Sequence, residues 1–319
     1  MRSAGQCPKT LFWGKAATVL ALEWRGASVN NNKNASRVAV VPDEQALHVG
    51  WAAFDSRRLD EAERIARDVL ARDPQHAGAP HLLGVALLLQ KRPREAVGPL
   101  AQAARDTVNP VLETHYALAL RDVGRRDEAI DWLKRATSRK PVFAAAFHEL
   151  ALILCGMRRY DDAEVVLKHG IELAPGVAEF SVELGGIHIC RAEPAHAKAA
   201  FTRALALDPH HVRALHGCGT ALLFEGEFER AAAQFRLVLA RIPEHVRARL
   251  DLAHCLLELG RFDAGVAELR VVVRSSPQHY GAALKMLASS RRGRLWLRPS
   301  MAASFLQLID KVSSATWSS

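Results

Sequence analysis

The chain has 319 residues, of which 49% are hydrophobic and 24% are charged. This composition is typical of a soluble globular protein, and it excludes disordered, collagen-like and disulfide-scaffold chains. No stretch approaches the roughly 20 consecutive apolar residues of a membrane-spanning helix, which excludes a polytopic membrane protein.

The formal net charge of +9 lies almost entirely in the two end segments. Residues 1–40 carry six basic side chains against one acidic side chain, and residues 285–319 have the same balance. The body between them is close to neutral. A nucleic-acid-binding protein concentrates positive charge on its folded surface, so nucleic acid is not an expected partner. Contact of the basic tails with an anionic membrane is a lesser alternative.

Residues 1–42 stand outside the pattern that dominates the rest of the chain. An apolar stretch at 11–22 follows a basic start, as in a signal peptide, but Lys15 interrupts it and Glu23 follows it closely. Asparagines dominate 30–34, which is typical of a polar linker. We expect a basic, disordered N-terminal extension. The alternatives are a targeting segment and a start codon assigned upstream of the real one.

Residues 43–279 contain an internal repeat marked by regularly spaced prolines. The first proline gap is 67 residues and holds two units, and each later gap is 34 residues. A small residue lies twelve positions before each proline, and another lies twelve positions before that one. The marker residues are Pro74, Pro141, Pro175, Pro209, Pro243 and Pro277.

This spacing predicts two helices of about a dozen residues in each unit, joined by a polar turn. In three units the turn contains Gly124, Gly226 or Gly260. Small residues recur where the two helices cross, because a short side chain lets the backbones approach, and large apolar residues fill the space beside them. Proline ends each second helix. Stacked pairs bury a core that no single pair could bury.

The repeat resembles the tetratricopeptide-repeat (TPR) family, most clearly at 214–231, 181–186 and 200–209. The resemblance implies an all-α fold, a right-handed α-solenoid of stacked antiparallel helix pairs known as a TPR superhelix. Val108 departs from the family pattern, because proline is expected there. The seven units are 43–76, 77–109, 110–143, 144–177, 178–211, 212–245 and 246–279.

Residues 280–319 begin like an eighth first helix and then break at the arginine-rich stretch 291–299. A last helix is expected from about 300 to 312, with one apolar face at helical spacing. We expect this region to consist of capping helices and a tail that cover the exposed core of the last pair. The alternative is an amphipathic anchor for a membrane or a partner. The apolar face comprises Met301, Phe305, Leu308, Ile309 and Val312.

No catalytic signature survives inspection, so we expect neither an enzyme nor a cofactor. His148 and Glu149 begin a zinc-protease motif, but Leu152 stands where the second histidine is required. His254 and Cys255 are adjacent on a helix and point about 100° apart, a poor geometry for a nucleophilic dyad. The chain has five cysteines and no C-x-x-C motif, which favours reduced, buried thiols and a reducing compartment.

The TPR resemblance implies that a partner binds the inner face of each first helix, at its fifth, sixth, ninth, twelfth and thirteenth positions. Histidine recurs there in four successive units. Asparagine is absent from the sixth and ninth positions, which disfavours the carboxylate clamp of chaperone co-factors. A metal site is not expected, because residues one repeat apart are about 9–10 Å apart. The predicted groove residues are His48, Trp51, His81, Val85, His115, Leu118, His148, Leu152, His216 and His254.

The predicted function is protein–protein interaction, as a scaffold or adaptor whose concave groove holds a peptide or helix of a partner. Unperturbed histidine titrates near pH ~6.5, so an acidic ligand is expected to bind more tightly as the pH falls from about 7.5 to 5.5. Two alternatives are a regulatory module of a transferase enzyme system and a bacterial secretion or envelope-assembly accessory protein. The expected location is cytoplasmic, with membrane-associated or exported as alternatives. Arginine-rich, lysine-poor usage suggests a bacterial source.

Overall fold

The structure is a computed structural model, and it describes residues 42–105 and 107–289. Within these ranges the chain forms fifteen α-helices and one 3-10 helix, and no strand. The predicted N-terminal extension and the predicted last helix at about 300–312 lie outside the described residues.

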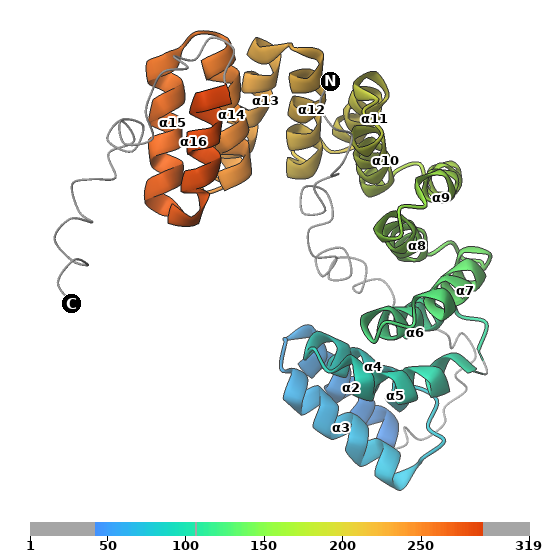
Figure 1. The fold of residues 1–319 in the computed structure, drawn as a ribbon. Coiled ribbons are helices and arrows are strands. Elements are labelled where there is room, and N and C mark those ends of the chain that lie inside the picture. The colour runs from blue at the N-terminus through green and yellow to red at the C-terminus, as the bar shows by residue number, and fades with distance from the viewer. Residues whose placement is uncertain (1–41, 106, 290–319) are drawn as a thin grey trace, which may run out of the picture. The chain divides into compact units, whose positions relative to one another are not determined.

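First and second helices alternate along the chain (Figure 1). The first helices are α2 (Pro42–Asp55), α4 (Ala79–Leu89), α6 (Pro110–Asp122), α8 (Ala144–Gly156), α10 (Ala178–Cys190), α12 (Val212–Glu225), α14 (Val246–Glu258) and α16 (Tyr280–Ser289). The second helices are α3 (Leu59–Arg72), α5 (Pro93–Arg105), α7 (Arg126–Thr137), α9 (Tyr160–Leu173), α11 (Pro194–Leu207), α13 (Phe228–Arg241) and α15 (Phe262–Ser275). A 3-10 turn, η1 (Pro277–His279), precedes α16. The prediction of an all-α solenoid of stacked antiparallel helix pairs is confirmed.

The chain divides into two compact units, with the boundary between Pro175 and Gly176. Within each unit, every first helix contacts its own second helix and the first helix of the next repeat. A first helix is therefore enclosed on several sides. This explains why nearly every residue of α4 and α10 is buried, whereas second helices such as α3 bury only one stripe.

The two helices of a pair meet through small residues, as the repeat predicts. At the start of the second helices these residues are fully buried: Ala62, Ala96, Ala129, Ala163, Ala197 and Ala231. Gly265 occupies the same position in α15, where an added Cβ would lie 3.3 Å from the carbonyl oxygen of Ala253 on α14. The second helix thus rests directly on the backbone of the first.

Large side chains of the second helix fill the space that small residues of the first helix leave open. Phe201 faces Gly185, where an added Cβ would lie 2.6 Å from the ring, and Phe235 faces Gly219, where the distance would be 2.7 Å. At the equivalent position other units carry leucine, which is also fully buried at Leu133, Leu167 and Leu269.

The turn between the two helices of each pair contains one residue in the left-handed backbone region. Glycine supplies it in three units, at φ values of 89°, 80° and 76° for Gly124, Gly226 and Gly260. Glycine adopts this region at no steric cost, whereas other residues are strained there. The remaining four turns use Arg57, Lys91, Arg158 and Ala192.

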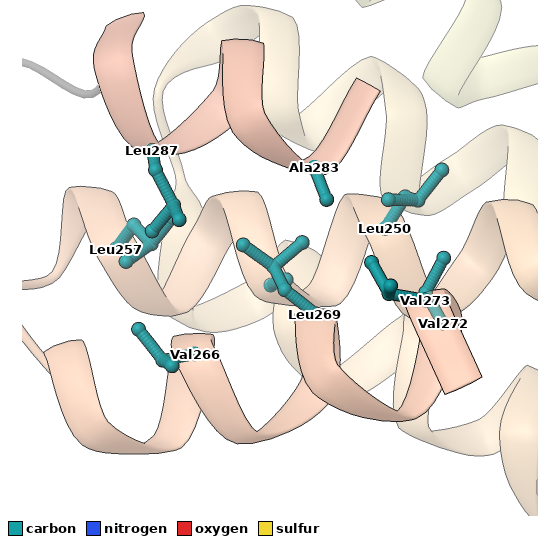
Figure 2. Close-up of a cluster of buried hydrophobic side chains, with 9 residues drawn as sticks. Leu250, Leu257, Val266, Leu269, Val272, Val273, Ala283 and Leu287 are labelled. Atoms are coloured by element: carbon teal, nitrogen blue, oxygen red, sulfur yellow. The ribbon is translucent and has the colours of Figure 1, made fainter. Parts of the chain in front are cut away.

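The end of the described array is covered by α16. Ala283 and Leu287 of this helix are buried against Leu257 of α14 and Leu269 of α15, together with the valines of α15 (Figure 2). Helix α16 therefore packs on α14 and α15 as the first helix of a further repeat would.

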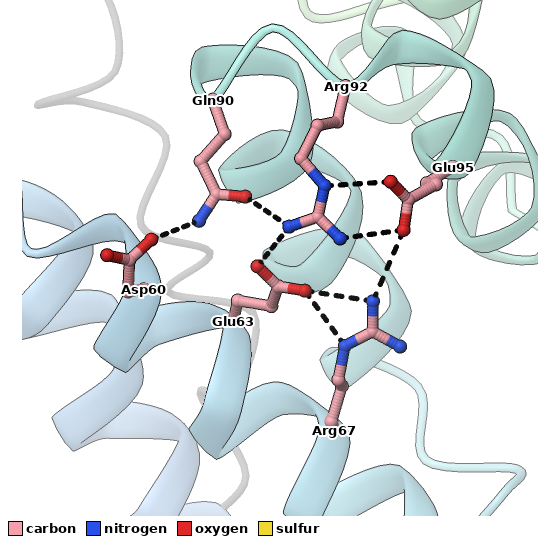
Figure 3. Close-up of polar contacts among 6 residues, drawn as sticks. All are labelled: Asp60, Glu63, Arg67, Gln90, Arg92 and Glu95. Atoms are coloured by element: carbon pink, nitrogen blue, oxygen red, sulfur yellow. Dashed lines mark hydrogen bonds and ion pairs between the residues drawn. The ribbon is translucent and has the colours of Figure 1, made fainter.

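Arginine–carboxylate pairs connect consecutive repeats on the outside of the array. Glu63 of α3 accepts hydrogen bonds from Arg67 Nε at 2.9 Å and from Arg92 Nη1 at 2.7 Å (Figure 3). Arg92 also holds both carboxylate oxygens of Glu95, each at 2.7 Å. Burial acts to raise the pKa of Glu63, but the bonds from Arg67 and Arg92 hold that pKa below its usual value. The network joins α3 to the turn before α5.

None of the described helices combines the length and the apolar character that crossing a membrane requires. Cys155, Cys218 and Cys255 are buried and form no disulfide, whereas Cys190 is disulfide-bonded, so the prediction of reduced thiols is wrong at Cys190.

We predict that Leu133→Ala and Leu167→Ala each lower the free energy of unfolding by about 2–5 kcal/mol, because both side chains are fully buried and leave cavities. Val165→Ala is the matched control, since Val165 is 68% exposed on α9 and its truncation leaves no cavity. Urea unfolding followed by helical circular dichroism measures the difference. Equal stabilities of the Leu167→Ala and Val165→Ala variants would contradict the assignment of Leu167 to the core.

Candidate partner-binding surface

The ten residues predicted for the groove differ in burial. Trp51, His81, Leu152 and His254 are partly buried, and His48 is exposed. Val85, His115, Leu118, His148 and His216 are buried. The last five are part of the core, because successive first helices pack side by side and enclose them.

Three of the predicted residues form a continuous stack across α2, α4 and α6. The ring centroids of Trp51 and His81 are 5.1 Å apart, and those of His81 and His115 are 5.0 Å apart, with an interplanar angle of 19° for the histidine pair. His81 Nε2 and His115 Nδ1 are 2.8 Å apart, so one nitrogen donates a hydrogen bond to the other. We refer to these three residues as the aromatic stack.

The two histidines of the aromatic stack are held in the neutral form. Burial lowers the pKa of His81 to about 4. Burial, together with the adjacent His81, lowers the pKa of His115 well below its ordinary value. The hydrogen bond between them also requires one unprotonated nitrogen. These two residues do not gain charge between pH 7.5 and 5.5, contrary to the expectation from unperturbed titration.

Two buried carboxylates on first helices are paired with an arginine of a neighbouring first helix. Glu149 of α8 is 1% exposed and forms an ion pair with Arg121 of α6. Glu183 of α10 is fully buried and accepts a hydrogen bond from Arg213 Nη2 of α12 at 2.6 Å. An isolated buried charge would be costly, so each pair neutralises the inner face. The sequence signal was an acidic residue at the sixth position, which we did not connect to an arginine.

His216 makes a comparable contact between α12 and α14. Its Nε2 lies 3.0 Å from Asp251 Oδ2, which also accepts from Arg247 Nε at 3.1 Å. Burial acts to raise the pKa of Asp251, but the bond from His216 and the charge of Arg247 lower it below its usual value. His254 has its contact within its own helix, where its Nε2 lies 3.7 Å from Oε1 of Glu258, one turn further along. His216 is thus engaged inside the structure.

The described thiols are poor nucleophiles. Burial raises the pKa of Cys255 to about 12, so its thiol remains protonated at neutral pH. Burial likewise raises the pKa of Cys218. Across residues 42–105 and 107–289, no group of three or more His, Cys, Asp or Glu side chains could hold a metal ion.

Comparison with known protein families finds matches to the repeats. Two family models described as tetratricopeptide repeat match residues 50–110 and 222–289. No curated protein sequence matches the chain.

Solved structures resemble the whole array. The C-terminal part of a TPR repeat-containing protein from Cytophaga hutchinsonii has a TM-score of 0.61 at 12% identity, covering 76% of this chain and 99% of that one. Pseudomonas aeruginosa PilF has a TM-score of 0.57 at 20% identity, covering 66% and 99%. A TPR protein from Parabacteroides merdae has a TM-score of 0.56 at 14% identity, covering 83% and 97%. The family models identify tetratricopeptide repeats at 50–110 and 222–289, and the likenesses in fold are consistent with an array of about seven such repeats.

Proposed function

We propose that the protein is a scaffold or adaptor that binds a peptide or helix of a protein partner on the inner faces of α2, α4, α6 and α8. TPR arrays are generally protein–protein interaction scaffolds. The observation that supports this surface is the aromatic stack, whose Trp51 and His81 rings are only partly buried. Flat, rigid rings offer a large contact area and lose little conformational entropy on binding.

The chemistry of this surface favours an uncharged, apolar partner segment. Helix α4 carries no charged residue between Ala79 and Leu89, and the buried carboxylates of Glu113 and Glu149 are paired with Arg135 and Arg121. Leu88, Leu89 and Leu152 are partly buried and add apolar area. Such a surface gains binding energy mainly from apolar and aromatic contacts. Attraction of an acidic ligand by charged histidines, expected from the sequence, is not part of this proposal.

We predict that the Trp51→Ala/His81→Ala double variant loses the partner that the full-length protein captures from native extract. Truncating two central aromatic contacts of an interface typically costs 2 kcal/mol or more, so the dissociation constant of the identified partner should rise at least about tenfold. Isothermal titration calorimetry with that partner measures the change. His169→Ala is the control, because His169 is an exposed histidine on the second helix α9. Unchanged affinity of a folded double variant would overturn the proposal.

We predict that His81 makes the protein less stable in acid. Its pKa of about 4 in the folded protein lies below the ordinary value of 6.5, so the unfolded chain binds the proton more readily. The stability is therefore complete above pH 6.5 and is lost as the pH falls towards 4, by up to about 3 kcal/mol. Urea unfolding at pH 7 and pH 4 should show a smaller loss for His81→Gln than for the wild type. A loss of the same size in both proteins would show that His81 is not held neutral.

A further inference from the structure

A second periodic set of histidines lies just before first helices, outside the predicted groove. The pattern Pro-X-His-X-X-Ala occurs four times just before a first helix, with its histidines separated by 135, 34 and 34 residues, and once more at 194–199, inside second helix α11. Two copies share the sequence His-Val-Arg-Ala, at 211–214 and 245–248. The four histidines are His76, His211, His245 and His279.

In the structure three of these four side chains accept a hydrogen bond at the N-terminus of the following helix, and His279 does not. His211 is the N-cap of α12, and its Nδ1 accepts a hydrogen bond from the backbone N–H of Ala214 at 3.2 Å. His245 is the N-cap of α14, and its Nδ1 accepts from Ala248 at 3.1 Å. His76 repeats the arrangement before α4, where its Nδ1 lies 3.2 Å from the backbone nitrogen of residue 79.

Capping by histidine depends on protonation in a way that capping by other residues does not. Serine, threonine and asparagine are the usual caps and do not titrate. Histidine accepts through Nδ1 only when that nitrogen is unprotonated. Protonation places an N–H against the backbone N–H of the helix, and it brings positive charge to the positive end of the helix dipole. Both changes remove the cap.

The groups around His211 moderate this effect but do not cancel it. Its Nε2 lies 3.8 Å from Glu179 Oε1 on α10, and this carboxylate attracts the protonated ring. The carboxylate of Glu179 cannot replace the capping acceptor, because it lies beside Nε2, whereas the cap is formed by Nδ1. Asp208 in the preceding turn accepts a hydrogen bond from the backbone N–H of His210 at 2.9 Å. Arg213 on α12 is committed to Glu183.

The surroundings of His245, in contrast, favour its neutral form. Its ring centroid lies 5.4 Å from that of His216 on α12. His216 and Arg247 share the carboxylate of Asp251, which is therefore largely neutralised. Burial and the neighbouring His216 lower the pKa of His245. The neutral, capping form is the form that this site favours.

We propose that His211 and His245 form a pH-sensitive capping device, in which protonation of the two rings on acidification releases the N-termini of α12 and α14. The two caps lie one repeat apart on adjacent first helices, so acidification loosens two neighbouring repeats together. The device does not depend on what the protein binds.

The test compares variants of the full-length protein at pH 7.5 and 5.5. His211→Asn/His245→Asn keeps an acceptor that does not titrate, whereas His211→Ala/His245→Ala removes the cap at both pH values. His196→Asn is the control, because His196 is an exposed histidine on the second helix α11 of the same unit. Hydrogen exchange of the Ala214 and Ala248 amides, expressed as protection factors, reports each cap directly.

In the wild type and the His196→Asn control, protection of the Ala214 amide should fall by up to about tenfold between pH 7.5 and 5.5, and protection of the Ala248 amide should fall less, because burial and His216 lower the pKa of His245. In the asparagine variant protection of both amides should change by less than about twofold, and in the alanine variant it should be low at both values. The same fall in the asparagine variant as in the wild type would overturn the proposal. So would unchanged protection in the wild type at pH 5.5.

Discussion

The close approach of two helices through small residues is the constraint on which the structure depends. Alanine or glycine at the start of each second helix brings it onto the backbone of the first helix, and even a Cβ added at Gly265 would lie 3.3 Å from the carbonyl oxygen of Ala253. This approach leaves a gap of defined size one turn further on. Leucine or phenylalanine of the second helix fills the gap, and phenylalanine occurs opposite Gly185 and Gly219, where the first helix contributes least volume. Pairs built in this way stack, and their inner helices become almost fully enclosed.

Enclosure of the first helices also decides the chemistry of the inner face. A polar residue placed there must find a partner within the array, because water is largely excluded. Glu149 and Glu183 form ion pairs with an arginine of a neighbouring first helix, and Asp251 pairs with an arginine of its own helix. His81 and His115 form a hydrogen bond with each other. The surface that remains accessible is apolar and aromatic, so the partner-binding proposal follows from packing rather than from charge.

The fold could be predicted from the sequence because each repeat carries its own evidence. Proline, the small crossing residue and the large filling residue each recur in phase through six or more of the seven units, and each has one physical explanation. Side-chain partners could not be predicted in the same way. Repeat phase places His115, His148 and His216 on the inner face, but whether such a face is open depends on how neighbouring first helices pack. The capping histidines were equally periodic in the sequence, and only the hydrogen bonds to Ala214 and Ala248 reveal their role.

The most direct test of the central constraint is to enlarge one crossing residue and measure the free energy of unfolding. Ala231 is fully buried at the crossing of α12 and α13, whereas Ala233 is exposed two residues further along α13. If the helices must approach this closely, Ala231→Leu forces them apart and lowers the free energy of unfolding by at least about 1–3 kcal/mol. Ala233→Leu should leave it within about 0.5 kcal/mol of the wild type. Equal stability of both variants would contradict the account.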